Sequence, residues 1–284
     1  MQAGLLYRRP RAQLSLLLAG PIGWLGVAYL GSLAVLFLAA FWRLDTFSGL
    51  VVHDLSLENF RTLAGQGVYG TIVLRTAGIA AAVTATDALL AFPIAFFMAK
   101  VARPRTRALL VVAILMPLWA SYLVKVYAWR IILADEGILN WALSPLGIKG
   151  PGFGVVATWI VFSYLWLPYM ILPIYAGLER IPGSLLDASG DLGGRPGMTF
   201  RRVVLPLALP AVVAGSIFTF ALTLGDYIAP QIVSGGQQFI GNVVYTNVGV
   251  ANNLPLASAF ATVPVVIMVV YLLVARRLGA FEAL

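Results

Sequence analysis

Long runs of apolar residues dominate this chain and predict helices that cross a membrane. The hydrocarbon core of a bilayer is about 30 Å thick, so a spanning helix needs about 20 apolar residues. Four runs reach that length without a charged residue, and two more contain a few ionisable side chains. The six predicted spans are 21–42, 71–99, 108–130, 154–178, 203–225 and 254–275. Backbone groups in lipid must be satisfied within their own segment, so each span is predicted to be a helix.

The composition supports this interpretation. Of the 284 residues, 61% are hydrophobic and 11% are charged, whereas soluble domains average about 45–50% and about 25%. The chain contains no Cys, which excludes disulfides, and His53 is its one histidine, which argues against a zinc site. We therefore expect an all-α polytopic membrane protein in which residues 1–284 form a single transmembrane domain, in contact with membrane lipid and without a bound metal.

Basic residues predict the orientation. If six spans alternate, 13 of the 19 Lys and Arg residues lie on one side, which carries a net charge of +9 against −1 for the rest. They are found in the N-terminal tail, the 100–107 loop, the 179–202 loop and the C-terminal tail. The positive-inside rule makes this side cytoplasmic and places both termini there. The charge of +8 is thus a topology signal, and we expect no nucleic-acid partner.

The segment 179–206, between the fourth and fifth spans, predicts a short helix lying across the cytoplasmic face. Ser184 is a candidate N-cap, and Asp187 three residues later completes a candidate capping box. A helix over about 185–192 should follow. Gly193 should end it, since glycine tolerates the left-handed backbone conformation found after helix ends.

One face of this helix is small and apolar, and helical spacing builds it from Leu185, Ala188, Ser189 and Leu192. Such a face lets the backbone of another protein approach closely. The alternative is an ordinary amphipathic loop without a partner, and the pattern alone does not choose between them.

A spaced motif in the same loop favours the partner. Asp187-Ala188-Ser189 is followed after three residues by Gly193 and after eleven more by Leu205-Pro206. This arrangement resembles the EAA signature of ABC importer permeases, with Asp in place of the usual Glu and Ser in place of the second Ala. Other parts of the chain are similar to the spermidine/putrescine branch of that family, namely 57–60, 117–127, 137–140, 167–175 and 235–242. That branch also includes importers of other small solutes.

The resemblance implies a type I ABC importer permease of the bacterial inner membrane, with a cytoplasmic coupling helix. It implies a second permease subunit, of a different chain, two cytoplasmic ATPase subunits and an external solute-binding protein. ATP and Mg²⁺ would bind the ATPases, since this chain has no G-x-x-x-x-G-K-[ST] phosphate loop. The implied ATPase-coupling residues are Ser184, Leu185, Asp187, Ala188, Ser189, Asp191, Leu192, Gly193 and Arg195.

Two residues at the outer end of the fifth span are candidates for the solute pathway. A carboxylate beside an aromatic ring suits an ammonium group, and Asp226 is followed by Tyr227. We therefore expect both to line the outer pathway of a polyamine importer. The alternative is that Asp226 only caps the end of the span.

Four more residues within the predicted second and third spans are weaker candidates. Asp87 lies near mid-membrane, where a charge is costly, and is expected to pair with Lys125 or to face the pathway. Trp119 and Tyr122 could form aromatic walls for a polyamine chain, or could simply pack between helices.

Two other classes of protein are compatible with six spans. A secondary transporter or channel would work without ATP, but offers no reason for the 179–206 loop. A membrane enzyme would need a reactive cluster, and the sequence contains no catalytic constellation. Among permease functions, import of another small organic solute or of an ion stays open beside polyamine import.

Overall fold

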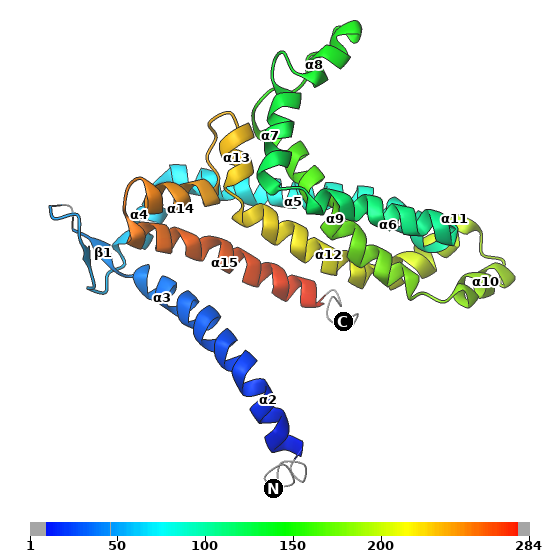
Figure 1. The fold of residues 1–284 in the computed structure, drawn as a ribbon, viewed down its shortest axis with the longest axis horizontal. Coiled ribbons are helices and arrows are strands. Elements are labelled where there is room, and N and C mark those ends of the chain that lie inside the picture. Colours follow the sequence, from blue (N-terminus) through cyan, green and yellow to red (C-terminus); the bar gives the residue numbers. More distant parts are fainter. Residues whose placement is uncertain (1–9, 46, 278–284) are drawn as a thin grey trace.

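The computed structural model describes residues 10–45 and 47–277, which form an elongated helical bundle (Figure 1). Arg8, Arg9 and Glu282, which enter the charge balance, lie outside the described residues. The N-terminal helix runs through α2 (Pro10–Trp24), η1 (Leu25–Gly31) and α3 (Ser32–Ala39). Strands β1 (Arg43–Leu44) and β2 (Val51–Val52) then pair in antiparallel fashion, with Arg43 opposite Val52.

The remaining elements are helical. The first group is α4 (Glu58–Gly65), α5 (Gly67–Phe96), η2 (Phe97–Val101), α6 (Pro104–Trp119), α7 (Tyr122–Leu133), α8 (Ile138–Leu143) and η3 (Ser144–Leu146). The second group is α9 (Val155–Glu179), α10 (Gly183–Asp191), α11 (Pro196–Thr199), η4 (Phe200–Val204), α12 (Leu205–Gly225), α13 (Ile228–Val233), α14 (Ile240–Gly249) and α15 (Leu254–Arg277). We call the end of the bundle that carries α10 the α10 end, and the opposite part, where α4, α13 and α14 lie, the α13 end (Figure 1).

Within residues 10–45 and 47–277, five continuous helices are long and apolar enough to cross a membrane. They are Leu17–Ala39, Gly67–Val101, Val155–Glu179, Pro196–Gly225 and Leu254–Arg277. A sixth crossing is made if α6 and the segment from Tyr122 to Leu146 count as one span, bent by 92°. The predicted all-α fold with six spans is confirmed on this count.

The prediction of an unbroken third helix over 108–130 is wrong. The helix ends at Trp119, the backbone is extended at Ala120 and Ser121, and a new helix begins at Tyr122. Pro117 has no N–H to donate, which weakens the last turn of α6. Beyond the break, α7 and α8 project away from the bundle (Figure 1).

Helices α5, α9 and α12 form the core of the bundle, and small residues let α9 and α12 approach closely. A Cβ on Gly177 would lie 2.3 Å from the Cβ of Ala211, and one on Gly215 would lie 2.9 Å from the sulfur of Met170. At Gly177 only glycine fits without a shift of α9 or α12, whereas at Gly215 the Met170 side chain would have to move. The resulting pair of tightly packed spans carries α10 between their ends.

Candidate functional site

Helix α10 begins earlier than predicted, and its first turn is capped differently. It starts at Gly183, with Pro182 at the N-cap position and no side-chain cap. The Leu185 amide donates to the Pro182 carbonyl at 3.2 Å, which closes the first turn. The capping box of Ser184 and Asp187 is therefore wrong. The ring of Pro182 fixes its own backbone and starts the helix one residue before the serine.

The end of α10 agrees with the prediction. Gly193 has a φ of +77°, the left-handed conformation that favours glycine. The Gly193 amide donates to the Gly190 carbonyl at 2.8 Å, and the Gly194 amide donates to the Ser189 carbonyl at 2.8 Å. A Cβ on Gly194 would lie 2.6 Å from that carbonyl oxygen, so the two glycines make a turn that other residues would strain.

Most of the predicted coupling residues are exposed at the α10 end. Leu192 is 90% exposed and Leu185 is 43% exposed, whereas Leu186 on the opposite side packs against the core of α5, α9 and α12. Ser189 is turned partly inward and shares a hydrogen bond of 2.8 Å with Thr199 of α11. The other exposed members of the set are Ser184, Asp187, Ala188, Asp191, Gly193 and Arg195.

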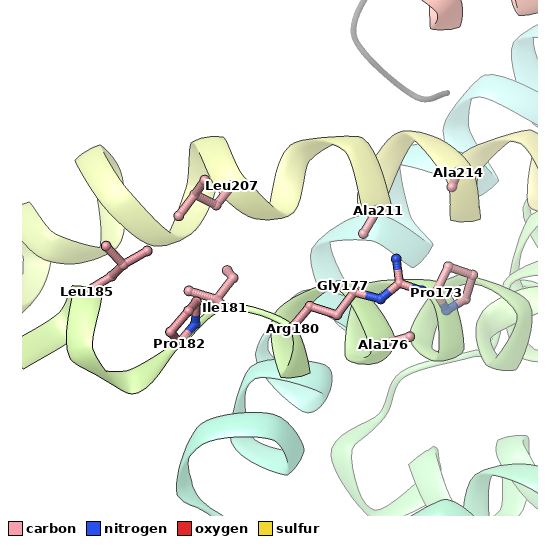
Figure 2. Close-up of a pocket in the computed structure, with 10 residues that line it drawn as sticks. All are labelled: Pro173, Ala176, Gly177, Arg180, Ile181, Pro182, Leu185, Leu207, Ala211 and Ala214. Carbon is pink, nitrogen blue, oxygen red and sulfur yellow. The ribbon is translucent and has the colours of Figure 1, made fainter. Parts of the chain in front are cut away.

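A crevice lies beside α10. The crevice is about 460 Å³ in volume and separates the ends of α9 and α12 (Figure 2). Leu185 of α10 and Leu207 of α12 line one part of it, and Arg180 extends along it toward Pro173 of α9 (Figure 2). Apart from Arg180, the side chains that line this crevice next to α10 are apolar.

Two basic residues of the 100–107 loop, Lys100 and Arg107, make structural contacts in this region. Arg107 donates to the carboxylate of Glu179 at 3.1 Å, and Lys100 donates to the carbonyl of Ile181 at 2.6 Å. Glu179 is the last residue of α9, and Ile181 lies between α9 and α10. The position of Lys100 and Arg107 in the basic 100–107 loop was the one signal in the sequence, and it did not specify their partners.

At the α13 end the structure joins two of the candidate pathway residues. The Tyr122 hydroxyl donates to the Asp226 carboxylate, although the two are 104 positions apart in the sequence. The same carboxylate accepts the amides of Ile228 at 2.8 Å and Ala229 at 3.1 Å. Asp226 therefore stabilises the start of α13, whereas the sequence analysis had considered capping of the fifth span.

Two aromatic stacks lie near this carboxylate, and one of them includes its hydrogen-bond donor Tyr122. Trp166 of α9 stacks on Tyr122 with ring centroids 6.0 Å apart, and no sequence pattern singled it out. Tyr227 turns toward α14 and stacks on Tyr245 at 4.7 Å. The Tyr227 carbonyl accepts the side-chain amide of Asn242 at 2.8 Å, which fixes the turn after α12 against α14.

The predicted ion pair between Asp87 and Lys125 is wrong. Asp87 is fully buried beside Ser163 of α9, and among the described residues neither side chain has a hydrogen-bond partner within range. Lys125 lies on α7, beyond the 92° bend, and forms no ion pair with any described residue. The break in the third span thus separates the two charges. Trp119, at the break, is 84% exposed.

Comparison with known proteins decides the family. Residues 91–281 match the family model described as "Binding-protein-dependent transport system inner membrane component". The chain belongs to this family of ABC importer permeases. The resemblance found in the EAA-like loop is therefore confirmed, and the permease is a multi-pass protein of the inner membrane.

Curated relatives cover nearly the whole permease. It is 46% identical to the inner membrane ABC transporter permease protein YdcU of Escherichia coli (strain K12), over 99% of this chain and 95% of that protein. It is 29% identical to the spermidine/putrescine transport system permease protein PotB of Haemophilus influenzae, over 81% of this chain and 82% of that protein.

Solved structures show the same fold. A chain of a bacterial alginate ABC transporter, in complex with its alginate pentasaccharide-bound periplasmic protein, aligns with a TM-score of 0.75 over 97% of the permease and 96% of that chain, at 14% identity. A chain of the MetNI methionine ABC transporter aligns with a TM-score of 0.59 over 78% of the permease and 98% of that chain, at 15% identity. The fold is that of type I ABC importer permeases, as predicted.

Proposed function

We propose that the permease imports a small organic cation of the polyamine type. The observation that carries this proposal is the carboxylate of Asp226 among aromatic rings at the α13 end. An ionised carboxylate has about four lone-pair sites, and the hydrogen bonds from Tyr122, Ile228 and Ala229 occupy three. One site is left for an ammonium group, which the neighbouring tyrosine ring also attracts.

Relatives support the same solute class and also a second candidate. The PotB relative is named for spermidine and putrescine. The more similar YdcU relative carries no solute in its name. Import of another small organic solute or ion is therefore the alternative, with the same permease role.

The α10 residues named above form the docking site for a cytoplasmic ATPase in this proposal. Their exposure and the capped end of the helix support it, because a rigid short helix transmits a push better than a mobile loop. The α10 end and both termini are then cytoplasmic. A pair of ATPase subunits binds ATP and Mg²⁺, a different permease chain completes the pathway, and an external binding protein delivers the solute at the α13 end.

A solute panel on the assembled transporter tests the substrate. Uptake of labelled spermidine is measured in proteoliposomes containing the co-purified complex and its binding protein, with putrescine, neutral and anionic solutes as competitors. We expect polyamines alone to compete. Asp226→Asn should raise the KM about tenfold or more, since a hydrogen bond to a charged group contributes about 1.5–3 kcal/mol.

Asp135→Asn is the matched control, because Asp135 is an exposed carboxylate near the same end of the molecule. Its KM should equal that of the unmodified permease. An unchanged KM in Asp226→Asn removes that residue from the site. If the complex transports only a neutral or anionic solute and no polyamine, the polyamine proposal is contradicted.

A further inference from the structure

Arg107 is bound by all three of its side-chain nitrogens. Its Nε donates to the Met98 carbonyl at 3.0 Å and its Nη2 to the Ala99 carbonyl at 3.1 Å, both in η2 at the end of α5. Its Nη1 donates to Glu179 Oε1 at 3.1 Å, in the last residue of α9. One side chain of α6 therefore joins the ends of two other spans.

The acceptors on α5 are available because of where they lie. The last carbonyls of a helix have no partner within the helix, and Met98 and Ala99 belong to that final turn. A guanidinium group offers donors in a rigid planar arrangement, so it can bind these carbonyls and a carboxylate together. Lysine at this position could not reproduce that geometry.

The start of α10 is held from the same side by a second contact. Lys100 Nζ donates to the Ile181 carbonyl at 2.6 Å, one residue before Pro182. Glu179 also accepts the hydroxyl of Tyr175 at 3.1 Å. The segment from Glu179 to Pro182, which leads into α10, is thus tied to the turn between α5 and α6.

Polar contacts are found at or beyond both ends of helix α6. It has 16 residues, which gives a length of about 24 Å, and none of them is buried. At one end Arg107 binds Glu179. Beyond the other end, past the 92° bend, Tyr122 binds Asp226. Between the ends, Leu110, Val111 and Ile114 pack partly against the core. Polar contacts at both ends therefore connect the α10 end to the α13 end along one helix.

We propose that Arg107 is a positioning residue that transmits the movement of α10 through α6 to α7, and so to the Tyr122–Asp226 contact. This inference rests on the proposed docking of an ATPase on α10. It adds a second route to the direct one, in which α10 moves α12 through α11 and η4. Arg107 acts through Glu179 and does not touch the solute.

The absence of Cys allows the two routes to be labelled separately. A nitroxide label is placed at Leu123→Cys on α7 or at Leu209→Cys on α12, which are 48% and 41% exposed. Label mobility is recorded in the complete complex with and without ATP. In the otherwise unmodified complex, we expect ATP to change the mobility of both labels, and we call this change the response. Arg107→Gln and Glu179→Gln should each reduce the response at position 123 by about 2- to 30-fold, the range by which residues along a coupling route act, and leave that at 209 unchanged.

Arg105→Gln is the matched control, because Arg105 lies in the same first turn of α6, is exposed, and has no hydrogen bond or ion pair with any described residue. If Arg107→Gln does not accumulate in the membrane, Arg107→Lys replaces it in the test. Lysine keeps the positive charge but lacks the planar guanidinium donors, so the same reduction of the response at position 123 is expected. A normal response at position 123 in Arg107→Gln and Glu179→Gln overturns the inference alone. No response at 209 in the unmodified complex overturns the proposed docking, and this inference with it.

Discussion

Two carboxylates inside this permease have opposite surroundings. Asp226 accepts hydrogen bonds from Tyr122 and from two backbone amides. Asp87 is fully buried and has no hydrogen-bond partner among the described residues. A buried polar group without a partner costs about 1–3 kcal/mol, and more when it is charged. At the residue scale, therefore, Asp226 contributes to local order, whereas Asp87 reduces stability.

Replacement of Asp87 tests this difference. Asp87→Asn removes a buried ionisable group that has no hydrogen bond within range, so the Tm of the detergent-solubilised permease should be equal to or higher than that of the unmodified protein. In a double-mutant cycle with Lys125→Met, the coupling free energy should be below about 0.5 kcal/mol, as for residues that do not touch. If the two residues formed a buried ion pair, removing one partner would destabilise the protein by about 3–5 kcal/mol. A coupling free energy of that size would contradict the structure.

At the scale of elements, the sequence predicts most of this fold and fails at particular places. Hydrophobic length alone locates the spans, because the bilayer sets it. The end of α10 was predictable because Gly193 has a conformation that favours glycine. The break after Trp119 was not, since the contacts of Tyr122 with Asp226 and Trp166 are made across the fold. The same limit hid the partners of Arg107.

The crossing of α9 and α12 gives a prediction at this scale. Gly177→Leu should lower the free energy of unfolding by about 1–3 kcal/mol, the usual cost of overpacking, since even a Cβ would lie 2.3 Å from that of Ala211. Gly78→Leu on α5, where a Cβ meets nothing within 4 Å, is the control and should change stability by less than about 0.5 kcal/mol. Thermal unfolding in detergent measures both. Equal effects would contradict the close contact.

For the molecule as a whole, the distribution of basic residues and the predicted topology place α10 on the same side of the membrane. If the six spans alternate, 13 of the 19 basic residues share the side of the 179–202 loop, which contains α10. The positive-inside rule then directs that side to the cytoplasm. This is also the side on which an ATPase would find α10, so orientation and function depend on each other.

Reporter fusions test the orientation. A fluorescent protein fused after the last residue should fluoresce, because it folds in the cytoplasm, and alkaline phosphatase at that point should be inactive. Alkaline phosphatase inserted in η3 after Leu146, in the 131–153 segment, should be active. The reverse pattern would place α10 on the outer side and remove the basis for ATPase docking.

If α10 is the helix through which an ATPase drives this permease, the affinity-tagged chain should retain that ATPase only while the exposed face of α10 is intact. Ala188→Trp places a bulky ring on the exposed small face of α10, whereas the control Ala142→Trp makes the same change on an exposed residue of α8 at the other end. We predict that the ATPase co-purifies with the unmodified permease and with the Ala142→Trp variant. The amount of ATPase that co-purifies with Ala188→Trp should be at least about tenfold lower, as when a central contact contributing about 1.4 kcal/mol or more is lost. Full retention of the ATPase by a folded Ala188→Trp permease would contradict the account.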